Sequence, residues 1–84
     1  MDEKLLYEVE YKIGHYVGKL SIPVSDKQIM KDLKLKDKKI FDEVRKRLLL
    51  NLTCYETRHI ESHKNTKPKL WFYDKTLPDD WVKV

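Results

Sequence analysis

The sequence predicts an α+β fold in which three helices precede a β-hairpin, and two observations support this. Apolar residues recur at spacings of three and four over residues 3–20, 26–33 and 38–50, as in amphipathic helices. Residues 53–61 and 69–75 are rich in β-branched and aromatic side chains and flank a turn-rich segment, which is typical of a hairpin.

The first expected helix, residues 3–20, carries two stripes. The inward stripe is Leu6, Val9, Ile13, Tyr16, Val17 and Leu20. The opposite stripe is Tyr7, Tyr11, Gly14 and Gly18. A glycine inside a helix costs about 1 kcal/mol relative to alanine, so two on one face indicate close approach by another segment. We favour a homodimer interface here, and the alternatives are a docking site for the tail around Trp81 or an ordinary exposed face.

Helix boundaries follow from capping residues. Pro23 ends the first helix, and a very short strand is expected over residues 21–24. Ser25 and Asp37 are suited to N-cap the second and third helices, and Asn51 is suited to a left-handed C-cap. The residues expected to face inward from these two helices are Ile29, Met30, Leu33, Ile40, Phe41, Val44 and Leu48.

The hairpin has a basic, turn-rich tip over residues 62–68. In its second strand we expect Leu70 and Phe72 to face the core, because side chains alternate along a strand. Trp71 would then point the other way, where it either covers the open face of the domain or stacks on a ligand. The tail, residues 76–84, is expected to fold back and cover Trp81, so that residues 1–84 form a single domain.

Positive charge is concentrated in the middle of the chain. The formal net charge is +4. Residues 27–47 contribute about +5 and residues 53–75 about +2, whereas both ends are slightly acidic. This distribution favours an anionic partner for the third helix and the hairpin tip.

Several classes of protein are not expected. Cys54 is the only cysteine, so an intramolecular disulfide is ruled out, as suits a reducing compartment. No signal peptide or apolar span is present, which predicts a soluble, cytoplasmic protein, nucleoid-associated in a prokaryote and nuclear in a eukaryote. The set Cys54, His59 and His63 lacks the four ligands of structural zinc, so no metal or other cofactor is predicted. No catalytic motif is present, and we expect neither an enzyme nor a small-molecule substrate.

The order of elements resembles the winged-helix (winged helix-turn-helix) family of DNA-binding domains over roughly residues 3–75. The segments that carry the resemblance are SDKQIMKDL, LKDKKIFDEVRKRLLLNL and the hairpin ending in KPKLWFYD. Many members end the third helix with glycine, where this chain has Asn51-Leu52. The run Pro68 to Trp71 is also similar to the wing of Z-form nucleic-acid-binding domains, but the Asn and Tyr that those domains carry four apart on the third helix are missing here.

The resemblance implies duplex DNA binding, with the helix at 38–50 in the major groove and the wing at 62–69 on the backbone or in the minor groove. Lysine and arginine would neutralise phosphates or recognise guanine, and Asp42 would accept from cytosine. The predicted contacts are Lys36, Lys38, Lys39, Asp42, Arg45, Lys46, Lys64, Asn65, Lys67, Lys69 and Trp71. A compact transcriptional regulator of phage, viral or plasmid type fits this pattern. The alternatives are a protein-interaction module with the same fold, using Leu49 and Leu50, and an RNA-binding protein.

Overall fold

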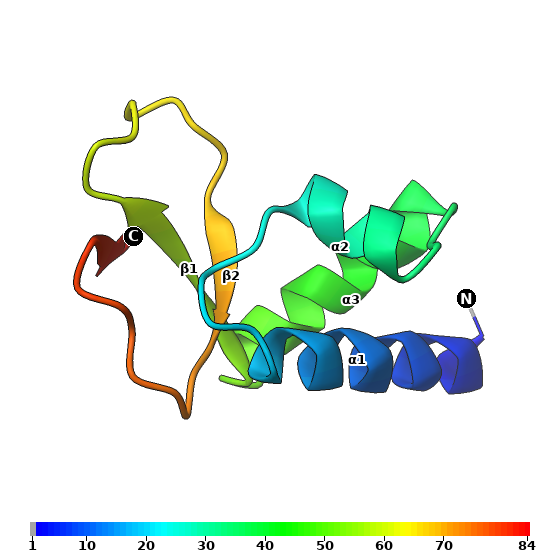
Figure 1. The fold of residues 1–84 in the computed structure, drawn as a ribbon. Helices are drawn as coiled ribbons and strands as arrows, with labels where there is room; N and C mark the ends of the chain where they lie inside the picture. The colour runs from blue at the N-terminus through cyan, green and yellow to red at the C-terminus, as the bar shows by residue number, and fades with distance from the viewer. Residues whose placement is uncertain (1) are drawn as a thin grey trace.

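The computed structural model describes residues 2–84, and these contain three helices and a three-stranded antiparallel sheet (Figure 1). This confirms the α+β class and the three predicted helices. The elements are α1 (Glu3–Gly18), α2 (Asp26–Asp32), α3 (Lys38–Leu50), β1 (Cys54–His59), β2 (Lys69–Phe72) and β3 (Trp81–Lys83).

Each helix begins at a side chain that satisfies free backbone N–H groups. Asp2 accepts from the Lys4 backbone N–H, and Ser25 accepts from the Gln28 backbone N–H at 3.1 Å. Asp37 accepts from two N–H groups of the first turn of α3, at 3.0 and 3.2 Å. Ser25 and Asp37 are therefore confirmed as N-caps.

The end of α3 differs from the prediction by one residue. Asn51 has a φ of −83°, so the predicted left-handed conformation at Asn51 is wrong. Leu52 adopts it instead, with a φ of 59°. The Leu52 N–H donates to the carbonyl of Leu49, and the Thr53 N–H donates to that of Leu48. This is the Schellman pattern, which places the left-handed residue one position after the C-cap and so at Leu52.

The sheet has the strand order β2-β1-β3, with both pairs antiparallel. Val24 extends the sheet by a single bridge to Leu70, in which the backbone nitrogen of each residue lies 3.1 and 2.9 Å from the carbonyl oxygen of the other. The short strand expected over residues 21–24 is therefore reduced to one residue. The tail, for which no secondary structure is predicted, forms β3, where Trp81 is paired with His59.

The core lies between α1, α3 and the inner face of the sheet (Figure 1), and α2 contributes Ile29 to it. The buried members of the predicted helical stripes are Leu6, Val9, Ile13, Val17, Ile29, Phe41, Val44 and Leu48. The remaining members, Tyr16, Leu20, Met30, Leu33 and Ile40, are partly buried and pack against this cluster. Cys54 and Leu70 complete the core from the sheet side.

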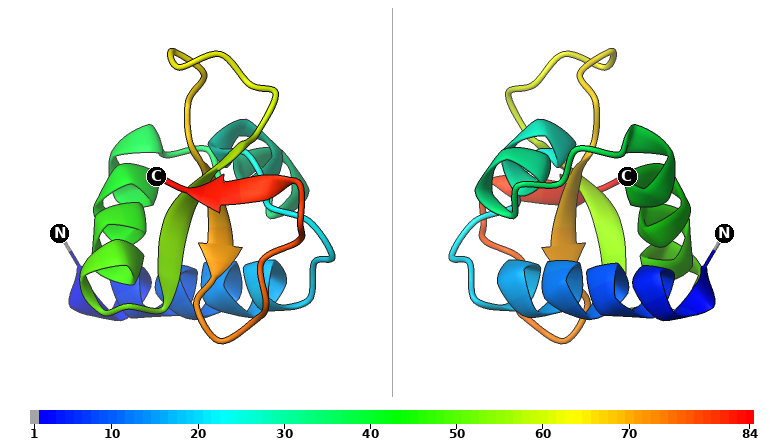
Figure 2. Two further views of the ribbon diagram at one scale, coloured as in Figure 1. Left: turned by 90° about the vertical axis from the view of Figure 1, so that its left-hand side faces the viewer. Right: turned by 90° about the vertical axis from the view of Figure 1, so that its right-hand side faces the viewer.

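The face of the sheet that is turned away from the helices is crossed by the tail (Figure 2). Trp71 lies on this face, opposite Leu70, yet only 1 % of its surface is exposed. Its indole N–H donates to the Lys75 carbonyl at 3.2 Å, and the Lys75 ammonium lies 5.0 Å from its ring centroid. Trp71 therefore covers the domain, and the prediction that it contacts DNA is wrong because its ring is closed off.

Candidate nucleic-acid interface

The hairpin loop, α2 and the beginning of α3 lie on the side of the molecule away from α1 (Figure 2). Of the positions predicted to bind DNA, Lys38 and Lys39 lie in the first turn of α3, and Lys64 and Lys67 lie in the hairpin loop. Lys36, in the turn before α3, borders a smaller hollow with Leu5 and Val9 of α1, so it is not part of this surface. The fold thus brings together two basic segments that are more than twenty residues apart in the chain. We call this surface the lysine face.

A hollow of about 440 Å³ lies in the lysine face. Its lining comes from α2, the first residue of α3 and the hairpin loop. The lining residues are Ser25, Asp26, Lys27, Met30, Lys38, Lys67 and Pro68. Lysines from three separate elements therefore border one cavity, and Asp26 is the only acidic residue among them. An anion at this position would meet a cation from each element.

Capping fixes where two of these lysines lie. Because Ser25 and Asp37 start α2 and α3, Lys27 and Lys38 fall in the first turns of their helices. The first turn of a helix also carries backbone N–H groups without intrahelical partners. The sequence does not indicate Lys27, because it lies on α2, outside the third helix and hairpin tip that the winged-helix resemblance implies as contacts.

The outward face of α3 is less basic than the sequence indicated. Lys39, Asp42 and Lys46 are exposed as predicted. Asp42, however, forms an i,i+4 ion pair with Lys38, and both side chains are 56 % exposed. Exposed pairs of this kind contribute at most about 1 kcal/mol to stability. Lys38 and Asp42 can therefore separate and bind other charged groups at little cost.

Arg45 was predicted to contact DNA, and the structure contradicts this because its side chain is only 12 % exposed. Its Nε donates to Asp26 at 2.8 Å, and its Nη1 donates to Glu56 at 2.8 Å. Its Nη2 donates to the Pro68 carbonyl at 3.3 Å. The guanidinium therefore joins α3 to α2, to β1 and to the hairpin loop, and a phosphate cannot reach it.

The ion pairs around Arg45 form one network. Asp26 is 5 % exposed and shares its second oxygen with Lys67, whose ammonium lies 3.0 Å away. Burial lowers the pKa of Arg45, but hydrogen bonds to Asp26 and Glu56 outweigh that effect, so the pKa is raised. A permanently charged arginine thus holds the loop against α2. Hydrophobic periodicity does not reveal this network, because it depends on the burial of Asp26 and on the tertiary position of Glu56.

The remaining loop and strand positions divide between two faces. Lys64 and Asn65 are exposed at the tip of the loop. Lys69 instead lies on the sheet face opposite the core, with its ammonium 5.2 Å from the centroid of Trp81. The predicted contact set therefore splits, and Lys69 stands apart from the hollow.

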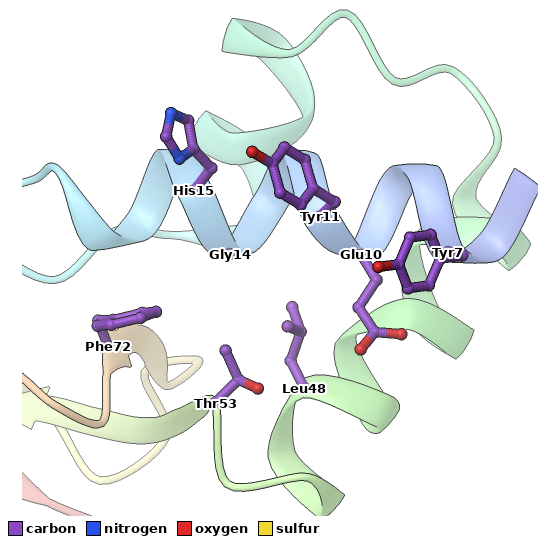
Figure 3. A pocket seen from close by; sticks show the side chains of 8 residues that line it. All are labelled: Tyr7, Glu10, Tyr11, Gly14, His15, Leu48, Thr53 and Phe72. Carbon is purple, nitrogen blue, oxygen red and sulfur yellow. The ribbon is translucent and has the colours of Figure 1, made fainter.

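A second hollow, of about 330 Å³, lies beside α1 (Figure 3). Figure 3 shows α1 on one side of the groove and Leu48, Thr53 and Phe72 on the other. Glu10 points across the groove, whereas the rings of Tyr11 and His15 turn away from it. The lining residues are Tyr7, Glu10, Tyr11, Gly14, His15, Leu48, Thr53 and Phe72. The tail does not reach this groove, because Trp81 pairs with β1, so the alternative that the tail docks on this stripe is wrong.

Cys54 and His59, which could act as a nucleophile or a metal ligand, have structural surroundings instead. Burial raises the pKa of the Cys54 thiol to about 12, which makes it a poor nucleophile at neutral pH. His59 accepts a hydrogen bond from the Glu61 backbone N–H through Nδ1 at 3.2 Å. Within residues 2–84, no three His, Cys, Asp or Glu side chains converge in a way that would hold a metal ion.

None of the helices in residues 2–84 combines the length and apolar character needed to cross a membrane. Comparisons with protein-family models, with curated proteins and with solved structures find no match for this chain. Its function is therefore argued from the geometry of its surfaces.

Proposed function

We propose that this protein binds duplex DNA through the lysine face. The observation that carries the proposal is the hollow of about 440 Å³, which Lys27, Lys38 and Lys67 approach from three different elements. Duplex DNA carries about one negative charge per 1.7 Å of its axis, and each phosphate neutralised by lysine releases counterions. A cluster of cations on one side of a small domain suits such a partner.

The arrangement of elements supports a winged-helix mode of binding. In that mode α3 enters the major groove and the hairpin loop lies along the backbone. The bridge between Val24 and Leu70 ties the segment before α2 to the hairpin, and Arg45 ties α3 to the loop. The longest dimension of the molecule, 38 Å, is close to one turn of duplex, about 34 Å.

We assign different roles to the basic residues in this mode of binding. Lys27, Lys38, Lys64 and Lys67 are the proposed phosphate contacts. Lys39, next to Lys38, and Lys46, about two turns further along α3, are both exposed and would face the base edges, where lysine recognises guanine. Asp42 would release Lys38 and accept from cytosine. Arg45 contributes indirectly, because it positions the loop that carries Lys67. Regulation of transcription is the role we propose for such binding.

The test is fluorescence anisotropy of a labelled 20-base-pair duplex titrated with the protein between 50 and 200 mM salt. We expect Lys39→Glu and Lys64→Glu each to weaken binding by about tenfold. Each should also lower the slope of log affinity against log salt concentration by about one, as expected for the loss of one phosphate contact. Lys19→Glu, which makes the same charge change at the end of α1, is the control and should leave the affinity nearly unchanged.

Two outcomes would contradict the proposal. One is an absence of binding at 50 mM salt, and the other is an equal loss of affinity in all three variants, which would indicate attraction by net charge alone. A duplex RNA of equal length is included, because tighter binding to RNA than to DNA would favour the alternative partner.

A protein-interaction role is the second candidate, and one observation favours it. Leu50 and Leu52, at the end of α3, are 73 % and 63 % exposed. Apolar side chains exposed next to each other at a helix end suit a protein partner better than DNA. Leu50→Ser would weaken capture of such a partner and leave DNA affinity unchanged, which separates the two roles.

A further inference from the structure

We propose that the groove beside α1 binds the same groove of a second copy of this chain, with the two α1 helices antiparallel about a two-fold axis at Tyr11. This inference does not depend on DNA binding. Tyr7 and Tyr11 are 69 % and 65 % exposed at the rim of the groove. Two large aromatic side chains exposed side by side on one helix are the kind of feature that interfaces bury.

The charge along α1 specifies a second copy as the occupant. Residues 2–10 contain four acidic residues and one lysine, whereas residues 11–19 contain two lysines and His15. Two antiparallel copies of this helix place the acidic half of one against the basic half of the other. Two parallel copies would place like charges together. A surface whose charge pattern complements itself under two-fold rotation is suited to an isologous dimer.

Helical geometry gives the contacts of this arrangement. With 3.6 residues per turn, Tyr7 and Gly14 project on the groove side of Tyr11, and Glu8, Lys12 and His15 project on the other side. Rotation about Tyr11 places Tyr7 of one copy over Gly14 of the second. It also places Glu8 of one copy beside Lys12 and His15 of the second, twice per dimer.

The fold of a single copy does not require glycine at position 14 or 18. A Cβ added at Gly14 would meet Thr53 at 3.7 Å and Leu48 at 3.9 Å, and one added at Gly18 would meet Phe72 at 3.6 Å. These are ordinary van der Waals distances, so the fold of one copy would accept alanine at both positions. Glycine is among the least favourable residues in a helix. In the proposed dimer the ring of Tyr7 from a second copy would lie over Gly14, where the lack of a side chain keeps the groove open.

The dimer leaves the lysine face free. The groove lies along α1, whereas the hairpin loop, α2 and the start of α3 lie on the opposite side of the molecule (Figure 2). Each copy would therefore present its own lysine face outward. The hydrogen bonds of Arg45 go to Asp26, Glu56 and Pro68, none of which belongs to α1, so we expect variants of the groove to leave them intact.

Sedimentation equilibrium from about 1 to 500 μM, without nucleic acid, tests the proposal. We expect a concentration-dependent dimer. Glu8→Lys and Lys12→Glu should each weaken self-association by tenfold or more, because each creates two repulsive contacts per dimer. An equimolar mixture of the two variants should associate nearly as well as the unmodified chain, because every repelling pair becomes an attracting one. Glu61→Lys, in the hairpin loop, is the matched control and should not alter association.

Two further variants separate folding from association. Tyr7→Glu changes an exposed residue and should abolish the dimer while the circular dichroism spectrum stays the same. Gly14→Ala should raise the melting temperature of the monomer and weaken the dimer, a combination that a purely structural glycine would not produce. A monomer at all concentrations would overturn the proposal, and so would a dimer that is insensitive to Tyr7→Glu or a variant mixture that fails to associate.

Discussion

Arg45 illustrates how a single residue organises the lysine face without belonging to its surface. Its guanidinium satisfies two carboxylates and a carbonyl that come from three different elements. Asp26 is almost fully buried, and its carboxylate is compensated by the guanidinium of Arg45 and the ammonium of Lys67. Removing one member of a buried pair leaves the other charged and desolvated, which is strongly unfavourable.

We therefore expect Arg45→Met to lower the free energy of unfolding by about 3 kcal/mol, as measured by urea denaturation. Lys46→Met, the neighbouring exposed position, should change it by less than about 0.5 kcal/mol. Adding Asp26→Asn to Arg45→Met should recover part of the loss, because the orphaned charge is removed as well. Equal effects of Arg45→Met and Lys46→Met would contradict the role assigned to the network.

At this scale the sequence predicted apolar positions well and polar ones poorly. The helical stripes identified most of the core because burial of apolar side chains follows the helical period. Arg45 lies at the edge of the buried stripe of α3. Nothing in the local sequence distinguishes an edge position that meets acidic side chains of other elements from one that faces water. Trp71 has the correct alternation, yet its cover comes from Lys75 and the tail, which are set by tertiary structure.

At the scale of elements, the first residues of the helices are easier to predict from sequence than the last ones. Ser25 and Asp37 act through their own side chains, so the sequence identifies them as N-caps. The end of α3 is defined by backbone hydrogen bonds, which place the left-handed conformation at Leu52 whatever residue is present. The strand β3 was missed because it has three residues and gains its stability from β1.

Leu52 is a position where glycine should be better than the natural residue. A non-glycine residue in the left-handed region costs about 1 kcal/mol or more, and Leu52 loses little burial because it is 63 % exposed. After subtracting the greater freedom of glycine in the unfolded chain, we expect Leu52→Gly to stabilise the fold by about 0.5 kcal/mol.

Lys46→Gly is the matched comparison for Leu52→Gly, because it places glycine at an exposed position inside α3. It should destabilise the protein by about 1 kcal/mol. Both variants introduce glycine at an exposed position, one with a left-handed backbone and one inside a helix, so opposite signs in thermal denaturation would identify backbone conformation as the cause. A loss of stability in both would show that Leu52 makes a contact worth more than the strain.

At the scale of the whole molecule, the fold gives different surfaces different chemistry. The lysine face contains α2, the start of α3 and the hairpin loop, whereas the apolar groove follows α1 (Figure 2). The sequence indicated both surfaces, since lysines and glycines are visible in it. It did not indicate that Asp26 and Glu56 would neutralise part of the basic charge, because these acids come from outside the predicted binding elements.

Alkaline pH should weaken the whole fold through two groups on different elements. Burial raises the pKa of Cys54 to about 12, and burial together with a hydrogen bond to Asp32 raises the pKa of Tyr16 to about 12. Both groups are neutral in the folded protein and ionise more easily once it unfolds. Their contribution to stability is therefore complete below the unfolded pKa values, near 9 and 10, and is lost as pH rises toward 12.

Urea denaturation at pH 8, 9, 10 and 11 should show a free energy of unfolding that falls above pH 9, by about 1 kcal/mol per pH unit from Cys54 alone. Cys54→Ala should lower stability at pH 8 through lost packing but flatten the decline between pH 9 and 10, whereas Tyr16→Phe should flatten it only above pH 10. The order of these effects follows from the order of the two unfolded pKa values. If the decline is as steep in Cys54→Ala as in the unmodified chain, Cys54 does not stay protonated inside the fold. Reaction of the native thiol with a disulfide reagent at pH 9 provides an independent check, because a buried neutral thiol reacts far more slowly than the same thiol in urea.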